Sequence, residues 1–118
     1  MHFILIVAYD LLFRSLLGAQ LKEEGFEVLG VATLDEAVLQ LGEVGTIPSL
    51  LIMESKELGI DQKALDLLGR ICAEVPLLLI HGAWDKPSQL KWAAGIYELV
   101  KPLSLGQIVE KAKELLAT

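Results

Sequence analysis

Short apolar runs alternate along the chain with segments whose apolar residues recur at helical spacing. Runs this short are typical of strands that are buried on both faces of a parallel sheet. The uninterrupted runs cover residues 3–8, 50–53 and 77–80, and a shorter one lies around 99–100. A further run at residues 26–31 contains Glu27 and Gly30, so we expect it to form an edge strand.

The intervening segments show the period of amphipathic helices and have recognisable start and stop signals. Serine or threonine followed three residues later by Glu or Gln is typical of a capping box, and glycine often follows a helix end. The expected signals are Gly25 after the first helix, Thr33 with Glu36 and a stop near Gly42 for the second, a start at Asp61 for the third, and Ser104 with Gln107 for the last. The predicted inward stripes are Phe13, Leu16, Leu17 and Leu21, then Leu65, Leu68 and Cys72, and finally Ile108, Ala112 and Leu115.

Strand followed by helix, five times over, predicts one doubly wound α/β domain across residues 1–118. We expect a flavodoxin-like (βα)5 fold, with a parallel five-stranded sheet and helices on both faces. The weak edge at the second strand favours the strand order 2-1-3-4-5. In that order, ligands and chemistry gather at the carboxyl ends of the first and third strands.

Composition and charge exclude several classes of function. Hydrophobic residues make up 53% of the 118 and charged residues 22%, which excludes a disordered chain. The net charge of −6 argues against direct nucleic-acid binding, which needs a basic face. No apolar run approaches the ~20 residues that span a bilayer. We recognise no targeting segment and therefore expect a cytoplasmic protein without membrane contact.

The strand ends at the expected functional edge carry a distinctive set of residues. They read Ala8-Tyr9-Asp10, Met53-Glu54-Ser55, Ile80-His81-Gly82 and Val100-Lys101-Pro102. With "ILIVAYDLLFRSLL", "PSLLIMESKELGID", "VPLLLIHGA" and "AAGIYELVKPLSLGQIVEKAKELL" around them, the chain resembles the receiver domains of two-component response regulators over essentially its whole length. Lys101-Pro102 after an apolar strand is the most specific fragment of this resemblance.

The resemblance implies phosphoryl transfer to an aspartate. That chemistry needs a divalent cation held by carboxylates, an attacking aspartate, a lysine and a hydroxyl. The family's acid pair falls on Ala8 and Tyr9, its phosphoacceptor on Glu54, its hydroxyl on His81 and its lysine on Lys101, while Asp10 lies one place past the acid pair. Of these positions Lys101 matches the family pattern, so the resemblance implies a degenerate phosphorylation pocket without a metal or other cofactor.

We therefore interpret the chain as a pseudo-receiver, a protein-interaction module that works without phosphorylation and is not an enzyme. Two alternatives stay open: a competent receiver that phosphorylates itself on Glu54, and a flavodoxin-like binder of small molecules. Glu54 with Lys101 is either an imitation of the phosphorylated state or an ordinary ion pair. Asp10 is expected to cap the first helix, and His81 lacks the nucleophile that a catalytic base would need.

The stretch "DKPSQLKWAAG" predicts a further helix, fourth in chain order, whose inward stripe begins at Leu90. On that register Trp92 points outward on the same face as Gln89 and Lys86, as an aromatic anchor for a partner would. The alternative register buries Trp92 in the core. The resemblance implies a kinase or output domain as the partner, and a homodimer through the fourth helix, fifth strand and fifth helix.

Overall fold

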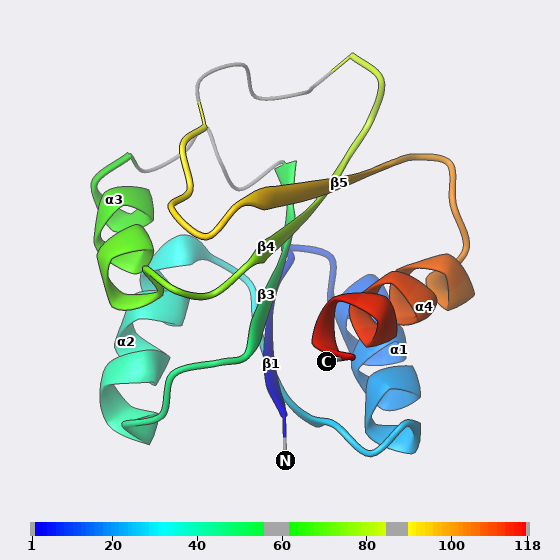
Figure 1. Ribbon diagram of the computed structural model, residues 1–118, viewed down its shortest axis with the longest axis horizontal. Helices are drawn as coiled ribbons and strands as arrows, with labels where there is room; N and C mark the ends of the chain where they lie inside the picture. The colour runs from blue at the N-terminus through cyan, green and yellow to red at the C-terminus, as the bar shows by residue number, and fades with distance from the viewer. Residues whose placement is uncertain (1, 56–61, 85–89, 118) are drawn as a thin grey trace.

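The computed structural model describes residues 2–55, 62–84 and 90–117 of the chain. Its strands form one parallel sheet in the order β2-β1-β3-β4-β5, which confirms the predicted topology (Figure 1). The strands are β1 Phe3–Val7, β2 Glu27–Val31, β3 Leu50–Glu54, β4 Leu77–His81 and β5 Ile96–Val100. The interrupted run at residues 26–31 therefore does supply an edge strand, β2, as its Glu and Gly indicated.

Helices cover both faces of the sheet. The described part of the chain contains α1 Leu11–Glu23, α2 Leu34–Val44, α3 Gln62–Ile71 and α4 Leu105–Leu116. Helices α1 and α4 lie on one face and α2 and α3 on the other (Figure 1). Successive strand residues alternate between the two layers: Leu5 and Leu51 pack toward α2 and α3, while Ile4 and Ile52 pack toward α1 and α4.

Three predicted helix ends are confirmed at atomic detail. Ser104 and Gln107 form a complete capping box at the start of α4. Gly25 follows the C-cap residue of α1 with φ 94°, a left-handed conformation that glycine adopts without steric cost. At α2 the side chain of Thr33 accepts from the backbone N–H of Glu36, as expected.

The predicted end of α2 near Gly42 is wrong. The helix continues to Val44, and Gly45, with φ 70°, is the C-cap. A Cβ at Gly42 would meet nothing within 4 Å, so that position is an ordinary exposed helix turn. The left-handed glycine three residues later supplies the stop because its N–H can then bond back to the carbonyl of Leu41.

The predicted stripe of α1 is correct except at Leu16. Leu17 and Leu21 are fully buried, but Leu16 is 47% exposed. The helix approaches the sheet through Gly18, where an added Cβ would lie 3.6 Å from Val28 Cγ1. This close approach turns the contact face toward Leu17 and Gly18 and turns Leu16 toward solvent. In α3, by contrast, the predicted stripe is buried as expected.

The predicted helix around Trp92 is not present in the described residues. Residues 90–95 have no helical conformation, and Trp92 is only 8% exposed. Its Nε1–H donates to the carbonyl of Val75 at 2.6 Å, and its ring packs over Gly69 of α3. The outward register was therefore wrong, and Trp92 is a core residue. Lys86 and Gln89 of the predicted partner surface lie outside the described residues.

Candidate functional site

The carboxyl ends of β3 and β5 bring a carboxylate and an ammonium group together. Glu54, the last residue of β3, is only 5% exposed. Lys101 follows β5, and its Nζ donates to Glu54 Oε2 at 2.6 Å. The lysine side chain is 38% exposed, so water reaches the ammonium group of the pair while the carboxylate is buried. The ion pair expected from the sequence is present.

The three residues that follow β1 have different surroundings. Ala8 is fully buried, and its N–H donates to Val31 O at 3.0 Å, which extends the β1–β2 ladder by one bond. Tyr9 is 71% exposed. Asp10 is the N-cap of α1, and its Oδ1 accepts from the N–H of Phe13 at 3.0 Å. The structure therefore gives the acid a capping role, as its position predicted.

Sequence reasoning missed Arg14, whose guanidinium closes this turn. Its Nη1 donates to Ala8 O at 2.7 Å and lies 3.4 Å from Tyr9 O. The side chain reaches these carbonyls by crossing over Gly30 of β2, where an added Cβ would lie 2.8 Å from Arg14 Cγ. The available signal was Gly30 itself, because a glycine inside a strand often marks a close approach.

His81 ends β4 and is 4% exposed. Its Nδ1 lies 2.8 Å from Gly82 O, and its Nε2 lies 3.1 Å from Glu98 Oε1 on β5. The second contact has the distance of an ion pair but not the geometry of a hydrogen bond, so Nε2 has no hydrogen-bond partner in the described part of the chain. Its main chain also joins the strand ends, since the N–H of Lys101 donates to His81 O at 2.8 Å.

Comparison with known proteins adds the family context. No family model matches the chain. It is 32% identical over 119 residues to the transcriptional regulatory protein AruR of Pseudomonas aeruginosa, which covers 96% of this chain and 48% of AruR. It is 29% identical over 109 residues to the transcriptional regulatory protein PdtaR of Mycobacterium tuberculosis, covering 90% of this chain and 52% of PdtaR. The chain thus spans about half the length of the curated relatives it matches.

Solved structures agree with these relatives. The receiver domain of the hybrid histidine kinase CckA superposes with a TM-score of 0.75 and 25% identity, over 97% of this chain and 98% of that one. A putative response regulator from Chloroflexus aurantiacus gives 0.73 and 26% identity, over 99% and 98% of the two chains. The chain has the receiver fold of the response regulators.

The described residues of the receiver contain no cluster of three or more His, Cys, Asp or Glu that could hold a metal ion. The carboxylates nearest the expected site are engaged elsewhere, because Asp10 caps α1 and Glu54 pairs with Lys101. Across residues 2–55, 62–84 and 90–117, no helix is long and apolar enough to cross a membrane.

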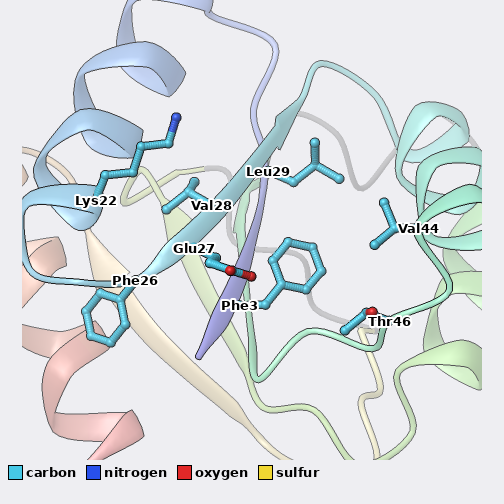
Figure 2. A pocket seen from close by; sticks show the side chains of 8 residues that line it. All are labelled: Phe3, Lys22, Phe26, Glu27, Val28, Leu29, Val44 and Thr46. Atoms are coloured by element: carbon cyan, nitrogen blue, oxygen red, sulfur yellow. The ribbon is translucent and has the colours of Figure 1, made fainter. Parts of the chain in front are cut away.

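A hollow lies at the opposite edge of the receiver, beside the edge strand β2 (Figure 2). Phe3, Leu29 and Val44 point into it from β1, β2 and the end of α2. The full lining is Phe3, Lys22, Phe26, Glu27, Val28, Leu29, Val44 and Thr46. These residues belong to the amino-terminal halves of β1 and β2 and to nearby helix ends, so the hollow is separate from the Glu54–Lys101 edge.

Proposed function

We propose that this receiver is a phosphorylation-independent protein-interaction module of two-component signalling, a pseudo-receiver that does not catalyse its own phosphorylation. The proposal rests on which residues occupy the carboxyl end of β1. A buried methyl group and an exposed phenol, Ala8 and Tyr9, stand where the resemblance implies a pair of metal-binding carboxylates. Mg²⁺ dehydrates reluctantly and needs such oxygen ligands, so the cofactor for phosphoryl transfer has little to bind.

The acid at the phosphoacceptor position supports the same proposal. Glu54 is buried and already bonded to Lys101, so an incoming phosphoryl donor would have to break an ion pair of 2.6 Å. His81, at the position of the family's hydroxyl, is directed to Gly82 and Glu98 instead of to Glu54. The receiver then presents its surfaces to a kinase or an output domain in a state that does not depend on phosphorylation. Both curated relatives are named transcriptional regulatory proteins, which agrees with a signalling partner of this kind.

Phosphorylation is tested by incubating the chain with acetyl phosphate and Mg²⁺ and measuring its intact mass. We expect no change, with a phosphorylation-competent receiver as the positive control. A hydroxylamine-labile gain of one phosphoryl group on Glu54 would establish a competent receiver and overturn the proposal. The variant Glu54→Gln is the matched control, since any gain that persists in it comes from another residue.

The metal is tested separately by an NMR titration with Mg²⁺ at millimolar concentrations. We expect no saturable shifts at Asp10, Glu54 or Lys101, and localised saturable shifts there would contradict the pseudo-receiver. A further experiment, light scattering after size-exclusion chromatography with and without acetyl phosphate, tests whether the oligomeric state depends on phosphorylation. The mass of the particle should be the same in both conditions, and a phosphate-dependent change of oligomeric state would count against the proposal.

A further inference from the structure

His81 is buried with an oxygen acceptor beside each of its ring nitrogens. Gly82 O lies 2.8 Å from Nδ1, and a carbonyl oxygen can only accept, so Nδ1 is the donor. A neutral imidazole carries one proton, and here that proton belongs to Nδ1. In the neutral ring, Nε2 therefore presents a lone pair to Glu98 Oε1, which lies 3.1 Å away.

The arrangement suits the doubly protonated ring better than the neutral one. With a bare Nε2, two electron-rich atoms face each other, and a buried polar atom is left without a donor. A second proton changes this contact into an attraction between the buried ring and the Glu98 carboxylate, whose side chain is 35% exposed and therefore partly screened by water. The proton on Nε2 therefore decides whether this contact is attractive or repulsive.

We propose that His81 and Glu98 form a proton-operated clamp between the ends of β4 and β5. The protonated ring attracts Glu98 and holds β5 against β4, and loss of the Nε2 proton releases the contact. The receiver would then respond to a proton at the position where its family uses a phosphoryl-binding hydroxyl. This inference goes beyond the proposed function and stands without it.

The mechanical effect of the clamp follows from the position of β5. This strand is at the edge of the sheet and has β4 as its neighbour on one side. Tyr97 and Val100 on it are 40% and 49% exposed. Release of Glu98 from the ring therefore removes one side-chain contact between this edge strand and β4.

The other charged groups around His81 are placed so that they interfere little. Glu54 and Lys101 neutralise each other at 2.6 Å. Along their strands they follow Ile52 and Leu99, which pack toward α1 and α4, whereas His81 follows Leu79 on the opposite face. Helix α3 covers that opposite face with apolar side chains, namely Ala64, Leu65 and Leu68. Among the described residues, Glu98 is thus the charged group that contacts the ring.

The clamp is tested by NMR without a phosphoryl donor or Mg²⁺, so the outcome does not depend on the phosphorylation experiments. His2→Gln provides the background, because it removes the other histidine, which is exposed near the amino terminus. We expect the ring nitrogen shifts of His81 and the backbone amides of Tyr97 and Val100 to move in one common transition when the pH is varied.

Glu98→Gln is the decisive variant, since its amide can donate to the bare Nε2 and removes the need for a second proton. We expect the transition of the β5 amides to shrink at least about threefold in this variant. Glu98→Asp, which withdraws the carboxylate from the ring, serves as a second variant should the amide perturb folding. The proposal is overturned if the backbone amide shifts of β5 stay constant while the His81 ring titrates. It is also overturned if the transition of these amides is the same in both Glu98 variants as in the parent.

Discussion

The Glu54–Lys101 pair gives the sharpest test of how the strand ends are stabilised. In Lys101→Met the apolar side chain cannot donate, so a carboxylate that is only 5% exposed loses its charged partner. Breaking a fully buried pair by removing one partner costs about 3–5 kcal/mol, and a hydrogen bond to a charged group is worth about 1.5–3 kcal/mol. Because the lysine is 38% exposed and therefore partly screened, we expect a loss of about 1.5–3 kcal/mol for Lys101→Met.

The complementary variant should cost less. Glu54→Gln leaves Lys101 free to turn toward water, so we expect a loss of about 1 kcal/mol or less. The double variant completes a cycle whose coupling energy should be about 1–2 kcal/mol. Lys111→Met is the control, because the side chain of its partner Glu114, at 3.3 Å, is 69% exposed and the pair should therefore contribute about 0.5 kcal/mol or less.

Urea unfolding followed by circular dichroism measures these differences. For a chain of this size we expect the Lys101→Met midpoint to fall by roughly 1–2 M, with an unchanged slope. A midpoint within roughly 0.3 M of the parent in both single variants would refute the reasoning, since it would mean that water already screens the pair.

Three further predictions concern the core and the β1–α1 turn. Trp92→Ala should cost about 3–5 kcal/mol of unfolding free energy, whereas an exposed anchor would lose about 0.5 kcal/mol or less on the same urea curve. Gly30→Ala should destabilise by about 1–2 kcal/mol because the new Cβ meets Arg14, and the loss should largely disappear in a background carrying Arg14→Ala, as a double-mutant cycle would reveal. Burial raises the pKa of the Cys72 thiol to about 11, so its native-state reaction with a disulfide reagent at pH 8 should be about 100-fold slower than in urea-unfolded chain; a rate equal to the unfolded one would contradict its burial.

The sheet could be predicted from the sequence because each strand carries its own evidence. An apolar run such as residues 77–80 can satisfy burial on both faces only inside a covered parallel sheet, and the acid within β2 pointed to an edge. Strand ends follow directly from strand positions, so the approach of Glu54 to Lys101 was also predictable. To predict that Glu54 and Lys101 form a pair, only the strand order of the sheet had to be known.

The errors share a physical origin in contacts between elements. The outward position of Trp92 assumed a helical register, and helical periodicity has no meaning for the irregular chain at residues 90–95. Leu16 was misplaced because the tilt of α1 depends on how closely Gly18 approaches Val28, a tertiary contact. Gly30 signals a close approach to β2, but the sequence does not show that Arg14 is the side chain that makes it or that Arg14 reaches Ala8 O.

Arg14 lying over Gly30 also bears on the solubility of the fold. An open parallel sheet has two unpaired edges, and a foreign strand that paired with one of them would begin intermolecular aggregation. Along β2 such a strand would meet the exposed carboxylate of Glu27 at the start and the Arg14 side chain that covers Gly30 near the end. It would have to desolvate the Glu27 carboxylate before it gained its hydrogen bonds. The side chain that closes the β1–α1 turn thus also covers the one position of the edge strand that has no side chain of its own.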